Sequence, residues 1–125
     1  MRAPILKQGR YLIASLQGSL NDADLTQLRD ELTSDIRRHR ATGVIIDVTA
    51  LDVVDSFAAR MLRGIAQMAR LLGAATVVVG IQPEVAFAMV QLGLQLEGTE
   101  TALDLEEGLV LLRTREDEEI SDAGG

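Results

Sequence analysis

The feature that most constrains the fold is a pair of short, mostly apolar runs, residues 44–48 and 76–79, with a helical pattern between them. Runs of this length that are rich in branched residues are typical of strands buried on both faces of a sheet. Between them, apolar side chains recur at helical spacing, namely Phe57, Met61, Ile65, Met68 and Leu72. A strand, a helix and a strand of this length predict a right-handed crossover that joins two parallel strands. The loop that leads into the helix should span Thr49–Val54.

The segments before this unit predict a hairpin and a first helix. Extended runs at residues 5–7 and 11–16 flank a glycine-containing turn, so the first strand pair should be antiparallel. The helix should open at Asp22 and Asp24 and end at Gly43. Its buried stripe should consist of Leu25, Leu28, Leu32 and Ile36.

The segments after the unit predict two more helices and one more strand. Pro83 occupies a position that is favoured in the first turn of a helix. The inner face of this helix should carry Val85, Met89 and Leu92. A short last strand should lie within residues 94–101. Asp104 and Glu107 then resemble a capping box for a fourth helix, which should end near Leu112.

Together these elements predict a single α/β domain with a mixed sheet of four to five strands and about four helices. The chain has 125 residues, which suffices for one ordinary core. Only 2% of the residues are aromatic, so Leu, Ile, Val, Ala and Met must fill that core. We expect the domain to span residues 1–115. The acidic and glycine-containing segment 116–125 predicts a disordered tail.

Composition also excludes several classes of function. Cysteine is absent and His39 is the only histidine, which removes thiolate chemistry and the common metal-site spacings. The glycine-rich phosphate-binding loops are missing as well, so we expect no cofactor. A net charge of −7 without a basic stripe argues against nucleic acid as a partner. Apolar stretches stay below the ~18 residues of a membrane helix, and we expect a cytoplasmic protein that does not contact a membrane.

Ser56 is the strongest candidate site in the sequence. It follows Asp55 at the start of the second helix, just past the carboxyl end of a buried strand, where open α/β sheets concentrate function. Either residue could simply cap the helix. The alternative is phosphorylation of Ser56, because a phosphate there would meet the amide groups of a helix N-terminus. The added charge and bulk would then act on whatever docks over this surface, and Asp52 and Asp55 would increase the repulsion.

Two other polar residues, Asp47 and His39, are candidates for parts of a site. Asp47 ends its strand, where it could hydrogen-bond the following loop or help to orient Ser56. An acid there also suggests a phosphoaspartate receiver, but the only lysine, Lys7, lies on the first strand instead of a later one. His39 should lie at the opposite edge of the sheet from Ser56, and no G-x-S-x-G elbow is present. We therefore expect a protein that is not an enzyme.

Several segments together resemble a known family. They are Asp47, residues 55–62 (DSFAARML), residues 71–74 (LLGA), residues 79–86 (VGIQPEVA) and residues 92–94 (LGL). The combination looks like the STAS domain of the anti-sigma-factor antagonists, over about residues 4–113. Simple antagonists usually continue Asp-Ser with Ser or Thr and then Gly, whereas Phe57 and Ala58 follow Ser56 here. This departure favours the stressosome branch of the family.

The resemblance implies a non-catalytic stressosome scaffold and phospho-switch. A serine/threonine protein kinase (RsbT-like) would phosphorylate Ser56, with Asp55 and Asp47 supporting the site, and a phosphatase (RsbX-like) would reverse the reaction. A large hetero-oligomer with a sensor-bearing STAS paralogue (RsbR-like) would sequester the kinase. Phosphorylation would release the kinase in a stress-signalling cascade. The alternative within the family is a soluble anti-sigma-factor antagonist that binds an anti-sigma kinase one-to-one.

Overall fold

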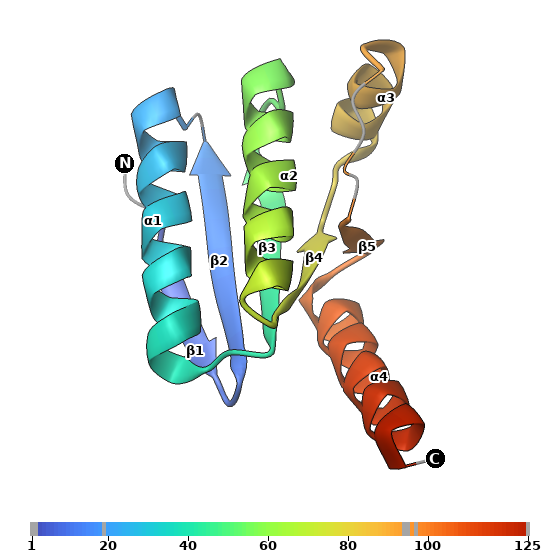
Figure 1. The fold of residues 1–125 in the computed structure, drawn as a ribbon. Coiled ribbons are helices and arrows are strands. Elements are labelled where there is room, and N and C mark those ends of the chain that lie inside the picture. Colours follow the sequence, from blue (N-terminus) through green and yellow to red (C-terminus); the bar gives the residue numbers. More distant parts are fainter. Residues whose placement is uncertain (1–2, 19, 94–95, 97, 125) are drawn as a thin grey trace.

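The computed structural model describes residues 3–18, 20–93, 96 and 98–124. The elements in chain order are β1 (Ile5–Gln8), β2 (Tyr11–Gly18), α1 (Asp22–His39), β3 (Gly43–Leu51), α2 (Ser56–Leu71), β4 (Ala75–Val79), α3 (Pro83–Gln91), β5 (Glu100–Ala102) and α4 (Leu105–Gly124) (Figure 1). The strands form one sheet in the order β1-β2-β3-β4-β5. The β1–β2 pair is antiparallel and the other pairs are parallel. The predicted α/β class and mixed sheet are confirmed.

The sheet is covered by helices on both faces, because alternate residues of each central strand point to opposite sides. Figure 1 shows α1 and α2 side by side in front of β2 and β3. The larger core lies on this face, where Val44, Ile46 and Val78 of the strands meet α1 and α2. On the other face, Ile45 and Val77 belong to a smaller core with α4. The end of the sheet where β3 and β4 finish therefore lies between two well-packed layers.

Helix α1 forms largely as its sequence predicts. Asn21 caps it in a capping box with Asp24, and the four apolar residues of the expected stripe are all buried. Its end differs from the prediction, which placed the stop at Gly43. The helix ends at His39, and Arg40 takes the left-handed conformation with φ 50°. Gly43 instead begins β3, where an added Cβ would overlap the Leu112 side chain.

Strand β3 is longer than its apolar run. Only part of the loop expected at Thr49–Val54 is a loop, because the residues up to Leu51 belong to the strand. The reason is pairing with β2, whose Gln17 and Gly18 lie opposite Ala50 and Leu51 after an irregularity in the register. Local sequence does not reveal such pairing. The loop that leads into α2 is consequently only residues 52–55.

Helix α2 buries a different face from the one predicted. The buried residues are Ala58, Ala59, Leu62, Ile65, Ala66 and Ala69. Of the expected stripe, only Ile65 is fully buried, while Leu72 is 38% exposed. Four of the six buried residues are alanines, whose small side chains let a helix lie close to a sheet. Large side chains such as Phe57 and Met61 pack against the edge of the core instead.

The last two helices also differ in extent from the prediction. Val85 and Met89 line the inner face of α3, but Leu92 is 62% exposed, because it follows the last helical residue. The fourth helix was expected to end near Leu112, yet α4 continues to Gly124 and crosses the expected boundary at residue 115. The short last strand is confirmed at β5. Residues 94, 95 and 97 of its predicted range lie outside the described residues.

Candidate functional site

At the start of α2, one residue caps the helix and the next residue is exposed. Asp55 is the N-cap, and its carboxylate accepts a hydrogen bond from the Ala58 N–H at 2.8 Å. The Asp55 carbonyl accepts from the Ala59 N–H at 2.9 Å. Ser56 is the first helical residue and is exposed. Since Asp55 performs the capping, the Ser56 hydroxyl is not needed for it.

The electrostatics of this turn suit an added anion. The first turn of α2 contains no acidic residue, so the partial positive charge of its N-terminus is offset only by the Asp55 cap. By contrast, α1 and α4 both carry acids in their first turns. An anion on the Ser56 oxygen would lie where a helix favours negative charge, by roughly 0.3–1 kcal/mol for an exposed group.

Asp47 is engaged with its own strand end. Its Oδ1 accepts hydrogen bonds from the Thr49 N–H at 2.9 Å and from the Thr49 hydroxyl at 2.6 Å. This is the local bonding that the sequence left open as one of two roles for Asp47. The other role, orientation of Ser56, stays a prediction. The two hydrogen bonds join Asp47 to Thr49 of the same strand.

Thr49 connects this strand end to α3, which the sequence analysis did not foresee. Gln82, the residue before α3, donates from Nε2 to the Thr49 carbonyl at 2.9 Å. The backbone of Gly80 lies so close to Thr49 that a Cβ added at Gly80 would overlap the Thr49 side chain. Gly80 also has a φ of 79°, which favours glycine. The only sequence signal was a glycine directly after a buried strand. These contacts fix the ends of β3 and β4 relative to each other.

Two hollows lie beside the loop 52–55. The larger, of about 300 Å³, is lined by residues 49–54 together with Gln82, Glu84, Val85 and Ala88. The smaller, of about 160 Å³, is lined by Leu20, Leu25, Leu51, Val53, Asp55 and Ala58. Val53 borders both and is 68% exposed. The surface beside the loop 52–55 therefore has two depressions, and the exposed Val53 side chain forms an apolar ridge that borders both.

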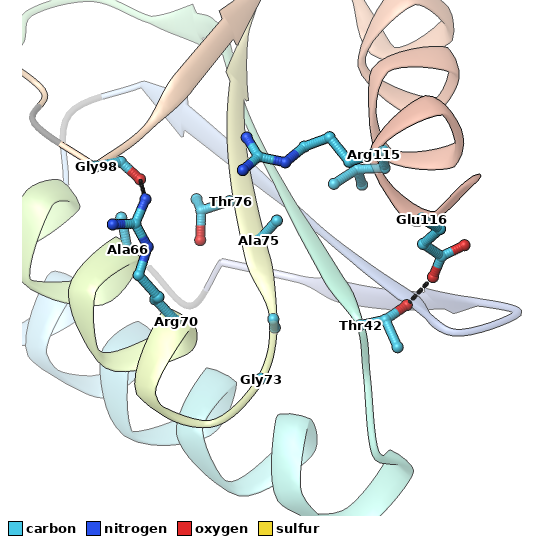
Figure 2. Close-up of a pocket in the computed structure, with 11 residues that line it drawn as sticks. Thr42, Ala66, Arg70, Gly73, Ala75, Thr76, Gly98, Arg115 and Glu116 are labelled. Carbon is cyan, nitrogen blue, oxygen red and sulfur yellow. Dashed lines mark hydrogen bonds between the residues drawn. The ribbon is translucent and has the colours of Figure 1, made fainter. Parts of the chain in front are cut away.

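A third cavity, of about 340 Å³, lies at the other end of the sheet, where β3 and β4 begin (Figure 2). Figure 2 shows Arg70 and Arg115 on opposite sides of β4. Arg115 forms an ion pair with Glu100, and Arg70 donates to the Gly98 carbonyl at 3.5 Å. The charged groups of this cavity are thus already partnered within the chain, and we assign it no ligand.

Glu116 fastens α4 to the sheet at this end. Its carboxylate accepts hydrogen bonds from the Thr42 hydroxyl and from the Tyr11 hydroxyl, the latter at 2.8 Å. The hydrogen bond from Thr42 is the main cause that holds the Glu116 pKa below its ordinary value. Burial and the bond to Glu116 raise the Tyr11 pKa to about 12. These contacts join Glu116 to residues 105 and 74 positions earlier in the chain, although composition alone predicts a tail from residue 116 onward.

The remaining candidates lie away from Ser56. His39 ends α1 ahead of the start of β3, whereas Ser56 follows the end of β3. The two residues are therefore at opposite edges of the sheet, as predicted. Within residues 3–18, 20–93, 96 and 98–124, no group of three or more His, Asp or Glu residues is placed to hold a metal ion. The helices of the described part include none that is long and apolar enough to cross a membrane.

The chain belongs to the STAS domain family, whose model matches residues 2–108. Among solved structures, it is similar to RsbS from Moorella thermoacetica, determined as a variant in which one serine is replaced by glutamate. That match has 38% identity and a TM-score of 0.80, and it covers 94% of this chain and 99% of the other. The family and branch predicted from the sequence are confirmed.

Two further relatives place the chain among stressosome proteins. One solved structure, described as "Molecular architecture of the stressosome, a signal integration and transduction hub", contains a similar chain. That chain is 37% identical to this one, with a TM-score of 0.73. The match covers 89% of this chain and 96% of the chain in that structure. The RsbT co-antagonist protein RsbRA of Bacillus subtilis is 29% identical over 112 residues, which are 90% of this chain. The chain spans 41% of the length of RsbRA, so activities of that whole protein do not transfer to it directly.

Proposed function

We propose that this protein is a stressosome scaffold and phospho-switch, which sequesters a serine/threonine kinase and releases it when Ser56 is phosphorylated. The observation that carries the proposal is the division of roles at the start of α2. Asp55 caps the helix, which leaves Ser56 exposed at the first helical position. The similarity to RsbS supports the same reading, since it covers almost the entire chain.

Phosphorylation of Ser56 should leave the fold intact. The side chain is exposed, so a phosphate would displace no core residue. The new charge of about −1.5 to −2 would meet the N-terminus of α2, which favours anions. The effect of the modification would therefore fall on the partner that covers this surface.

The phosphate would oppose kinase binding through its charge and its bulk. A kinase that is ready to phosphorylate Ser56 holds the phosphates of its nucleotide directly opposite the hydroxyl. A phosphoserine would bring a second dianionic group to the same place, beside the carboxylates of Asp52 and Asp55. Like charges placed together in an interface cost several kcal/mol, which is enough to convert a stable complex into a transient one.

The same proposal covers the partners of the switch. An RsbT-like kinase would be held on a large hetero-oligomer built with a sensor-bearing, RsbR-like STAS paralogue, and an RsbX-like phosphatase would reset Ser56. In this account the chain contributes a surface and a hydroxyl, and the chemistry belongs to the kinase and the phosphatase. Gel filtration with the paralogue distinguishes this assembly from a one-to-one antagonist, because only the scaffold forms a particle of very high mass.

The test is the affinity of an RsbT-like kinase, loaded with a non-hydrolysable ATP analogue, for matched variants of the chain. Wild type and Ser56→Ala should bind alike, and Ser56→Asp should bind at least about tenfold more weakly. Ser34→Asp is the control, because Ser34 is an exposed residue of α1 and receives the same charge change. Equal affinity for wild type, Ser56→Asp and Ser34→Asp would reject the switch.

A further inference from the structure

Val53 stands out among the exposed apolar residues because of its surroundings. Single exposed apolar side chains are ordinary. Val53, however, is 68% exposed, borders both hollows beside the loop 52–55, and precedes Ser56 by three residues. An exposed apolar ridge between two depressions is a shape that a partner can grip from both sides. A partner seated there would lie beside the start of α2, because Asp55 and Ala58 line the smaller hollow.

The charge around the ridge has one sign. Asp52 and Glu84 line the larger hollow, and Asp55 lines the smaller one. None of the residues that line either hollow is basic. An apolar centre with an acidic border is complementary to a surface that presents apolar side chains bordered by Lys or Arg.

The surface is also held in place before any partner binds. The end of β3 is fixed by the two bonds from Thr49 to Asp47, and Gln82 fixes the start of α3 against Thr49. At its other end the loop is fixed by the Asp55 cap of α2. A preorganised surface loses little conformational entropy when it binds, so it can contribute strongly to affinity.

We propose that Val53 and its two hollows form the docking surface for the kinase, which would insert apolar side chains beside the ridge and place basic ones near Asp52 and Glu84. This inference rests on the proposed function. A second copy of the chain fits less well, because a symmetric contact would bring the same carboxylates against each other. A permanent neighbour would also occupy the surface beside the first turn of α2, where the kinase has to reach Ser56.

The inference separates two contributions to kinase binding. The ridge and its acidic border would supply affinity in both states of Ser56. The phosphate would act locally, against the nucleotide that the kinase carries. Binding of the unphosphorylated chain should consequently weaken as salt rises, since the border charges lie within a Debye length of the partner.

Two matched pairs of variants test the docking surface in the same kinase-binding measurement. Val53→Ser is paired with Leu71→Ser, because Leu71 is 88% exposed at the far end of α2. Asp52→Lys is paired with Glu118→Lys, which makes the same charge change on an exposed residue of α4. We expect Val53→Ser and Asp52→Lys each to weaken binding about tenfold, whereas the controls stay within about twofold of wild type.

The outcomes distinguish this inference from the function on which it rests. If wild type binds the kinase and responds to Ser56→Asp, but Val53→Ser and Asp52→Lys match their controls, the docking surface is refuted and the switch stands. If these variants impair assembly with the paralogue and leave kinase affinity unchanged, the surface serves the scaffold and the inference is also refuted. If wild type does not bind the kinase, both proposals fail. Circular dichroism of each variant verifies that a loss of binding is not a loss of fold.

Discussion

Asp55 and Ser56 are adjacent, but only Asp55 caps α2, while Ser56 is exposed. The Asp55 carboxylate supplies the hydrogen bond that the first turn of α2 needs. Ser56 is consequently free of that duty, and its exposed hydroxyl can be modified without loss of the cap. The pair was identifiable from the sequence, because a strand end followed by Asp-Ser and a helical pattern is a local signal. The sequence did not reveal which of the two residues forms the cap, because Asp and Ser are both common N-caps.

Glu116 makes a prediction about stability at acidic pH. Its pKa is lower in the fold than its ordinary value of 4.5, mainly because Thr42 donates a hydrogen bond to it. The ionised form is therefore favoured by folding, so this stabilisation is present above about pH 4.5 and is lost as the pH falls through the folded pKa. We expect Glu116→Gln to lower the free energy of unfolding at pH 7 by about 1 kcal/mol. The difference from wild type should shrink as the pH falls below 4.5 and through the folded pKa.

Denaturant unfolding of both proteins at a series of pH values from 7 downward measures this effect. Glu118→Gln is the control, because Glu118 is exposed on the same helix. A constant difference between Glu116→Gln and wild type across this pH range would contradict the assignment. The residues involved were not predictable together, because Tyr11 and Glu116 lie on β2 and α4 and meet only in the folded chain.

At the scale of elements, α2 shows what the sequence pattern reveals and where it misleads. The existence of all four helices followed from periodicity, glycines and caps. The inner face of α2 did not, because large apolar residues dominated the predicted stripe while alanines form most of the buried face. The extent of β3 depended on pairing with β2, which is distant in sequence, and α4 continues past Glu116, whose partners Thr42 and Tyr11 are equally distant. A local sequence pattern does not predict such long-range contacts.

The corrected face of α2 predicts the energetics of its side chains. Leu62 is 1% exposed, so Leu62→Ala should cost about 2–5 kcal/mol of unfolding free energy through lost burial and a cavity. Met61→Ala should cost less, because Met61 is only partly buried beside the core. Chemical denaturation of both variants at neutral pH gives the comparison. A larger loss for Met61→Ala than for Leu62→Ala would restore the face that the sequence pattern predicted.

At the scale of the whole molecule, the two ends of the sheet have different roles. At the end where β3 and β4 begin, α4 is fastened through Glu116, and the charged groups of the cavity in Figure 2 are partnered within the chain. At the opposite end, Ser56, the Val53 ridge and its acidic border face outward. Both faces of the sheet are covered, so a partner in the proposed switch would reach Ser56 from this end.

The central claim is that Ser56 accepts a phosphate while the fold stays unchanged. Mass spectrometry of the chain after incubation with an RsbT-like kinase and ATP tests it most directly. The account predicts one added phosphate, located on Ser56, absent from the Ser56→Ala variant, and carried by a protein whose circular dichroism matches that of the unmodified chain. A phosphate located elsewhere, no phosphate at all, or unfolding upon modification of Ser56 would contradict it.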